Sequence, residues 1–325
     1  TLLQVRPAES EKGRVLGASS FLTFCAILGV GLLFSLVGDL GKPTFALALL
    51  GGIAVVVALY FSRLAAQLDS DENSATKPLA PFGARRFFAK IAQMILSLRY
   101  RVRVTGLESI VPAKAGEPGI LFLPNHPALI DPPILMSRLF GRFAPKPLSD
   151  SEQVEKPIVR QIMRFIKPII ITDVQKTGLA GRDRVLAAMQ EVVSHLKDGE
   201  NILLYPAGRL NRSAMENLGA NSGVEYILQQ LPEVRVVLVR TSGLWGSSFS
   251  YASGKAPDLM RKAGHFLLVL LANCLFFVPK RKVRIEFVQN VHLDASLGRK
   301  QLNANLEGFY NALSPKNVSV PYYFW

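Results

Sequence analysis

The stretch "LFLPNHPALIDPP", residues 121–133, places a histidine and an aspartate five positions apart, between an apolar run and a pair of prolines. "ILFLPN" is typical of a buried strand that ends just before His126. "DPPILMSRLF" is typical of a helix with Asp131 at its N-cap and a proline at the first helical position. The stretch therefore predicts a strand-to-helix junction, and such junctions form sites at the carboxyl edge of α/β sheets.

The chain around this junction alternates between strand-like and helix-like segments. The strand-like segments are 100–106, 119–125, 167–172, 200–206, 233–241 and 282–291. The helix-like segments are 132–140, 152–165, 181–197, 217–230 and 257–276. This alternation predicts an α/β fold, a layered domain whose mostly parallel sheet is flanked by helices.

Two uncharged runs, residues 15–38 and 43–62, precede this domain. Each is long enough to cross a bilayer, since a spanning helix needs about 20 apolar residues. Because only "DLGK" separates them, we expect a transmembrane helical hairpin. Basic residues at both ends of the hairpin predict a multi-pass protein of the cell membrane with its following domain on the cytoplasmic side. We assign residues 1–82 to the hairpin and a polar linker, and residues 83–325 to a membrane-associated domain.

Residues 83–98 combine basic and apolar side chains in a helical pattern. One face carries Phe87, Ile91, Met94 and Ile95, while the basic residues lie elsewhere. We expect an interfacial helix on an anionic membrane. The alternative is an ordinary amphipathic helix packed on the domain.

The composition points to an anionic partner. The chain has 325 residues, is 49% hydrophobic and carries a net charge of +14. Its mean hydropathy is +0.25 and its pI is about 9.9. Acidic lipid headgroups or a phosphorylated substrate fit this charge. No basic motif interleaved with aromatic residues is present, so we expect no nucleic acid as a partner.

The cysteines indicate neither disulfides nor a metal site. Cys25 and Cys274 both lie in apolar stretches, which predicts buried thiols. No cysteine–histidine cluster has the spacing of metal ligands, so we expect no metal.

The histidine–aspartate pair suggests acid–base chemistry. If the loop "PALI" folds His126 back against Asp131, the carboxylate accepts from one ring nitrogen and fixes the tautomer. The other ring nitrogen is then available as a general base. In the alternative interpretation Asp131 only caps a helix and His126 lies in a turn, and spacing alone leaves both open.

"NHPALID" resembles the NHxxxxD signature of the glycerolipid acyltransferases, which acylate glycerol phosphate and lysophospholipids. The resemblance covers roughly residues 85–292, with "YRVRVTGLESI" before the signature and "GENILLYPAGRLNRS" after it. It implies that His126 is the general base for the acceptor hydroxyl and that Asp131 orients it. The hydroxyl then attacks an acyl thioester directly, with no acyl-enzyme.

The resemblance also implies the partners. The acceptor is a lysophospholipid, and the thioester of acyl-CoA or acyl carrier protein is a co-substrate, with no resident cofactor. The layout is similar to the acyltransferase part of bacterial fusions that join a transporter-like membrane domain, an acyltransferase and an acyl-activating ligase. Such a ligase is therefore an expected fused or separate partner.

The acceptor site departs from the family pattern. Relatives carry a Pro-Glu-Gly-Thr-Arg block, and this chain has "PAGRL", with Ala207 at the Glu position and Leu210 at the Arg position. The candidate substrate-binding residues are Asn125, Pro206, Gly208, Arg209, Arg212 and Arg240.

Each arginine has a second interpretation. Arg209 and Arg212 form either a phosphate fork or part of a solvated basic loop, and Arg240 either faces the cleft or forms a structural ion pair. The changed block also keeps a rival function open, a non-catalytic lipid-binding or scaffold module.

Overall fold

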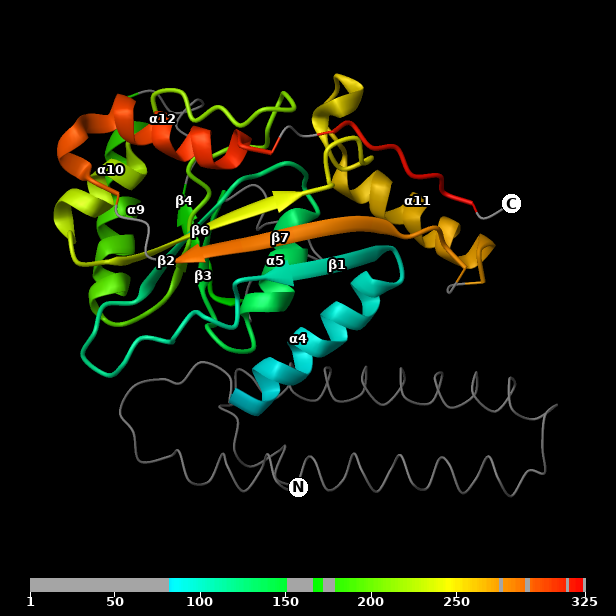
Figure 1. Cartoon of the computed structure of the whole chain (residues 1–325), viewed down its shortest axis with the longest axis horizontal. Coiled ribbons are helices and arrows are strands. Elements are labelled where there is room, and N and C mark those ends of the chain that lie inside the picture. The colour runs from blue at the N-terminus through cyan, green and yellow to red at the C-terminus, as the bar shows by residue number, and fades with distance from the viewer. Residues whose placement is uncertain are drawn as a thin grey trace. The chain divides into compact units, whose positions relative to one another are not determined.

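The computed structural model describes residues 82–150, 166–171, 179–274, 277–289, 293–313 and 316–323 (Figure 1). These residues belong to one compact unit, Phe82–Trp325. The hairpin predicted at 15–38 and 43–62 and the helix predicted at 152–165 lie outside the described residues. Within the described residues, none of the helices has both the length and the apolarity needed to cross a membrane.

A seven-stranded sheet organises the unit, in the order β1-β7-β6-β2-β5-β3-β4. Its strands are β1 (Tyr100–Thr105), β2 (Ile120–Pro124), β3 (Lys146–Asp150), β4 (Ile169–Ile171), β5 (Ile202–Leu203), β6 (Arg235–Ser242) and β7 (Arg281–Gln289). Every neighbouring pair is parallel except β6 and β7, which are antiparallel. The predicted α/β class with a mostly parallel sheet is therefore confirmed.

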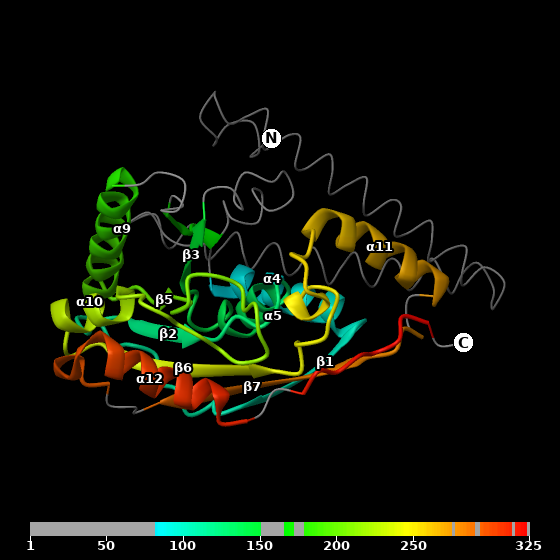
Figure 2. The ribbon, with the colours of Figure 1, turned by 90° about the horizontal axis from the view of Figure 1, so that it is seen from above.

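The described helices pack around this sheet. They are α4 (Phe82–Ser97), α5 (Asp131–Leu139), α9 (Leu179–Lys197), α10 (Gly223–Gln230), α11 (Leu259–Ala272) and α12 (Gly298–Asn311). Two short 3-10 turns, η1 (Tyr251–Ser253) and η2 (Ala295–Leu297), complete the described elements. Figure 2 shows α5 and α12 on opposite faces of the sheet.

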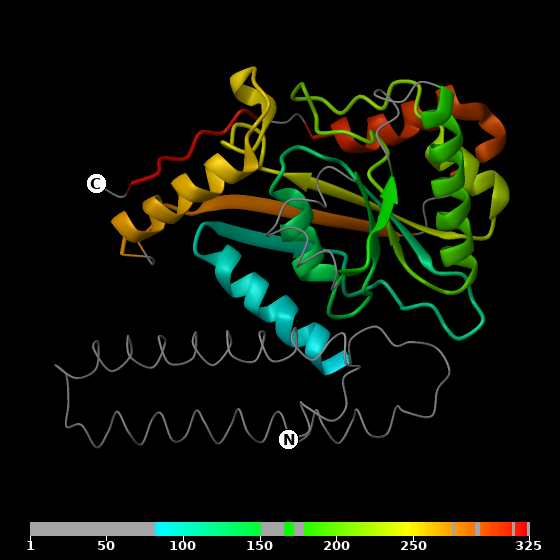
Figure 3. The same ribbon diagram turned by 180° about the vertical axis from the view of Figure 1, so that it is seen from behind.

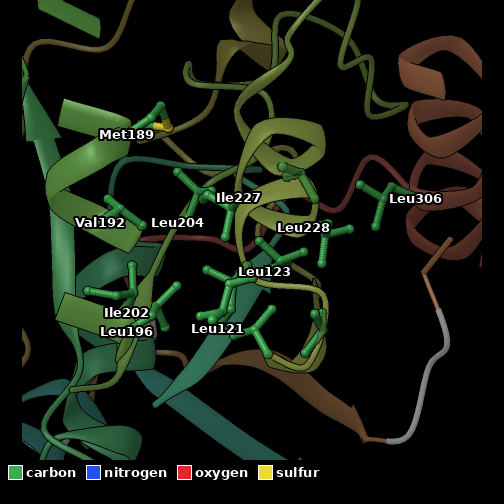
Figure 4. Close-up of a cluster of buried hydrophobic side chains, with 14 of the residues drawn as sticks. Leu121, Leu123, Met189, Val192, Leu196, Ile202, Leu204, Ile227, Leu228 and Leu306 are labelled. Carbon is green, nitrogen blue, oxygen red and sulfur yellow. The ribbon is translucent and has the colours of Figure 1, made fainter. Parts of the chain in front are cut away.

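Strand β2 is the centre of the core, and all five of its residues are buried. Successive side chains of a strand point to opposite faces. Leu121 and Leu123 join an apolar cluster with residues of α9, α10 and α12 (Figure 4). Phe122 lies outside that cluster and meets the ring of Phe143 edge-on at 5.5 Å. Burial on both faces fixes the register of β2 and so fixes where His126 emerges.

Three local expectations are wrong. Helix α5 has Ile130 at its N-cap, and Asp131 is its first residue, because the Asp131 side chain turns to His126 instead of capping the helix. Helix α10 begins at Gly223 rather than 217, since Gly219 has φ +58° and interrupts the helical pattern. Cys274, expected to be buried, is exposed beyond the end of α11.

Helix α4, Phe82–Ser97, agrees with the helix predicted at 83–98 to within one residue at each end. Its side chains Met94 and Ile95 are 65% and 55% exposed, and Gln93 donates to the carbonyl of Ser137 on α5 at 2.6 Å. One side of α4 therefore packs on the domain while apolar side chains remain at the surface.

Candidate active site

The residues after β2 lie at the carboxyl edge of the sheet. Strands β5 and β6 flank β2 and run parallel to it, so the loops that follow all three strands meet at this edge. Asn125 is buried and extends the pairing with β6. Its side-chain amide donates to the Thr241 carbonyl at 3.0 Å and accepts from the Thr241 N–H at 2.7 Å. These two contacts tie Asn125, a predicted substrate contact, to β6 immediately before His126.

His126 and Asp131 form the predicted contact, with 2.8 Å between Nδ1 and Oδ2. The Asp131 side chain is 1% exposed and that of His126 is 15% exposed. Because the carboxylate only accepts, Nδ1 carries the proton and Nε2 keeps a free lone pair. The loop thus holds the partly exposed His126 ring against the buried Asp131 carboxylate.

Tyr205 is a third side chain of this arrangement, and the sequence did not indicate it. It follows β5, and its hydroxyl donates to Asp131 Oδ1 at 2.6 Å. Its ring lies beside the His126 imidazole, with 4.4 Å between centroids and 33° between planes. Burial, then the neighbouring Asp131 carboxylate, raises the pKa of Tyr205 well above its ordinary value. The phenol therefore stays neutral and remains a donor.

A second residue that the sequence did not indicate, Glu216, holds the backbone of the His126 loop. Its Oε2 accepts the His126 N–H at 3.3 Å and the Asn211 side-chain N–H at 2.6 Å. The Asn211 N–H donates to the His126 carbonyl at 3.0 Å. Glu216 is 4% exposed, and its Oε1 has no hydrogen-bond partner among the described residues. Burial raises the pKa of Glu216 to about 7.

Two residues at the C-terminal end of helix α12 hold Glu216 and strand β2 in place. Asn311 accepts the Glu216 N–H at 2.8 Å and donates to the Glu216 carbonyl at 3.0 Å. The Tyr310 hydroxyl donates to the Leu123 carbonyl on β2 at 2.9 Å. This hydrogen bond joins residues 187 positions apart in the chain, on the strand that leads to His126.

The loop after β5 carries the other candidate residues. Pro206 is buried and its carbonyl accepts from the Asn221 amide at 3.0 Å, while Gly208 has φ +60° at the turn. Arg209 and Arg212 are exposed on either side of Asn211. Within the described part of the chain, neither guanidinium has a hydrogen bond or ion pair. Both are therefore available to an anionic group at the rim of the His126 loop.

Arg240 takes the structural interpretation instead. Its Nε and Nη2 donate to Glu286 Oε2 at 3.2 and 2.6 Å, and its Nη1 donates to the Phe309 carbonyl at 2.7 Å. The guanidinium also lies over the Phe309 ring at 4.8 Å. These contacts join β6, β7 and α12, which removes Arg240 from the substrate-binding candidates.

Comparison with protein families matches residues 101–279 to the Acyltransferase family. The match covers more than half of the chain, so the chain belongs to this family and is an acyltransferase. This confirms the class of enzyme that the signature around His126 indicated.

A solved structure has a similar fold. It is the 1-acyl-sn-glycerophosphate (LPA) acyltransferase PlsC from Thermotoga maritima, with a TM-score of 0.51 at 16% identity, over 79% of this chain and 93% of that chain. At this identity the likeness establishes the fold alone. A comparison with curated protein sequences finds no match.

Proposed function

We propose that this acyltransferase moves a fatty acyl group from a thioester donor to the hydroxyl of a lysophospholipid or acylglycerol phosphate. The observation that carries the proposal is the His126–Asp131–Tyr205 arrangement, a partly exposed base on a buried carboxylate whose two oxygens each accept a hydrogen bond. Such a base activates an alcohol without a covalent intermediate.

The proposed reaction has one proton relay. His126 Nε2 takes the proton of the acceptor hydroxyl as its oxygen bonds to the acyl carbon. The imidazolium that forms is stabilised by Asp131. The carbon–sulfur bond then breaks, and His126 returns the proton to the thiolate that leaves. The donor is therefore a thioester of coenzyme A or acyl carrier protein, and an acyl-activating ligase is a natural partner.

The acceptor carries a phosphate in this proposal. The guanidiniums of Arg209 and Arg212 are exposed and have no partner among the described residues, and they flank Asn211, which is bonded to the His126 loop. Arginine holds two phosphate oxygens at once. The similar fold of an enzyme named for 1-acyl-sn-glycerophosphate agrees with this class of acceptor.

Membrane attachment on the cytoplasmic side belongs to the same proposal. The uncharged runs 15–38 and 43–62 supply the hairpin, and the net charge of +14 suits anionic lipid. Exposed Met94 and Ile95 on α4 suit a helix at the interface. An active site at the membrane has direct access to lysolipid, because that substrate resides in the bilayer.

The test is an assay of radiolabelled acyl transfer from acyl-CoA and from acyl carrier protein to a panel of lysolipids. The full-length protein should acylate at least one phosphate-bearing acceptor. Binding of lysolipids without transfer from either donor would favour the rival function, a lipid-binding module.

A further inference from the structure

A cavity lies at the same sheet edge as His126, beside the first residues of β1 and β7. Its volume is about 380 Å³, and its lining includes Arg99, Tyr100, Ser247, Phe249, Arg281 and Tyr322. Because β6 and β7 are antiparallel, the last residues of β6 lie beside the first residues of β7. Because β1 and β7 are parallel, the first residues of β1 lie there too. The C-terminal segment 316–323 passes from α12 towards α11 along this side (Figure 3).

Two buried arginines are the unusual feature of this cavity. Arg99 is 5% exposed and Arg281 is 3% exposed. Arg99 donates to the carbonyls of Pro279, Pro321 and Val320. Arg281 donates to the carbonyls of Gly243, Gly246 and Val318. Each guanidinium has five N–H groups, so donors remain on both.

These contacts leave the two positive charges unneutralised. In the described part of the chain every hydrogen bond from either guanidinium ends on a backbone carbonyl, and no carboxylate forms an ion pair with either. The nearby Tyr100 cannot supply a negative charge near neutral pH, since burial raises its pKa to about 12. Desolvation lowers the pKa of both arginines, which reflects the cost of charge without a counter-ion.

Ser247 gives an independent sign of a missing ligand. It lines the same cavity and is 9% exposed. Its hydroxyl is buried and has no hydrogen-bond partner among the described residues. Buried hydroxyls are nearly always bonded, so an acceptor is expected here. The aromatic lining beside it favours a ligand that also has an apolar or planar part.

We propose that this cavity binds a phosphate group, held by Arg99, Arg281 and Ser247. A phosphate supplies the absent negative charge, and its oxygens accept from the remaining N–H and O–H donors. The phosphate belongs either to a lipid headgroup or to the nucleotide of a donor.

The cavity is also linked to the catalytic loop. The Phe249 carbonyl accepts the Leu129 N–H at 2.9 Å, and Leu129 lies between His126 and Asp131. A ligand that contacts Phe249 therefore lies next to a residue whose carbonyl is hydrogen-bonded to the loop that holds His126.

The test measures the melting temperature of the full-length protein in detergent, with inorganic phosphate against chloride at matched ionic strength. Phosphate should raise the melting temperature of the wild type by about 2–4 °C or more. Ser247→Ala should respond less. Ser247→Asp should melt higher than the wild type in chloride and lose its response, because the new carboxylate occupies the phosphate position. Ser109→Asp, at an exposed serine elsewhere, should respond like the wild type.

The proposal fails if phosphate has no specific effect on the wild type, or if both Ser247 variants keep the full response. The second outcome assigns phosphate to another site, such as Arg209. Glycerol 3-phosphate and adenosine 3′,5′-bisphosphate then identify the source of the phosphate. A larger Ser247-dependent rise in melting temperature with glycerol 3-phosphate indicates a lipid headgroup, and a larger rise with the bisphosphate indicates a nucleotide. No turnover enters these measurements, so their failure is distinct from failure of the proposed acyl transfer.

Discussion

At the scale of single residues, Asp131 is held by two donors that come from different parts of the chain. His126 Nδ1 contacts Oδ2 at 2.8 Å and the Tyr205 hydroxyl contacts Oδ1 at 2.6 Å. A buried oxygen that loses its donor costs more free energy than the bond contributes. The orientation of the His126 ring therefore depends on Tyr205 as well as on Asp131.

Tyr205→Phe should lower kcat/KM for acyl transfer about tenfold, because an unpaired buried oxygen costs about 1–3 kcal/mol. Steady-state kinetics on purified protein measure this effect. Tyr226→Phe, at a half-buried tyrosine on α10, is the matched control and should leave kcat/KM unchanged. Equal activity of Tyr205→Phe and the control would show that the hydroxyl does not support the base.

Glu216 makes stability depend on pH. Burial raises its pKa from 4.5 to about 7, against weaker opposing effects of the Asn211 hydrogen bond and of His126. The folded state therefore favours the protonated carboxyl. This contribution is complete below pH 4.5 and is lost as the pH rises through about 7.

Glu216→Gln should remove this dependence. Relative to the variant, the wild type should lose up to roughly 3 kcal/mol of unfolding free energy between about pH 4.5 and about pH 8. Urea unfolding of both proteins across this range measures the difference, with Glu233→Gln at an exposed position as control. A difference that stays constant with pH would mean that Glu216 titrates normally.

At the scale of elements, the sequence predicted those whose apolar pattern is strong. The run of buried residues in β2 and the alternation in β1 and β7 identify strands without help from the rest of the chain. The short junction left the His126–Asp131 contact as one of two interpretations, and the resemblance to the NHxxxxD signature favoured it.

Elements with weak patterns were missed. Strand β3, "KPLSD", is short and polar. Helix α12 contains Gly298 and Gly308, and only Leu302, Leu306 and Tyr310 form its buried apolar stripe. Tyr205 and Glu216 reach the site across separations of 74 and 90 residues. No local spacing reveals contacts of that kind, since they exist only once β2 and β5 are paired.

The loop after β5 is the element that should select the acceptor. Arg209→Lys should raise the acceptor KM or lower kcat/KM about tenfold to a hundredfold, because Lys cannot form the guanidinium fork and the lost contact contributes about 1.5–3 kcal/mol. Donor kinetics should stay nearly unchanged. Arg103→Lys, at an exposed arginine on β1, is the control. Unchanged acceptor kinetics would leave Arg212 as the remaining arginine of the loop.

For the molecule as a whole, a strongly positive net charge accompanies exposed apolar side chains. The net charge is +14, and Met94, Ile95, Leu268 and Phe277 are all more than half exposed. Leu98, at the end of α4, packs against the cluster formed by Val269, Leu270 and Val278. The exposed apolar residues of α4 and α11 therefore belong to neighbouring parts of the fold.

If residues 15–38 and 43–62 form the predicted spanning helices, the chain 1–325 should stay in the membrane fraction after washing with high salt or carbonate. A chain that begins at Phe82 should bind anionic vesicles in a salt-sensitive way, since exposed charges are screened beyond about 10 Å at 0.1 M salt. Met94→Asp with Ile95→Asp should weaken that binding, and Val111→Asp, at another exposed apolar residue, should not. Release of the full-length protein by salt alone would contradict the predicted hairpin.

The general-base function proposed for His126 is measured most directly as kcat/KM for acyl transfer by His126→Ala, beside His195→Ala as a histidine control from α9. Circular dichroism should show that both variants fold. The loss of a general base should lower kcat/KM about 10²–10⁴-fold for His126→Ala, while the control stays near the wild type. Wild-type turnover by a folded His126→Ala protein would show that His126 is not the general base.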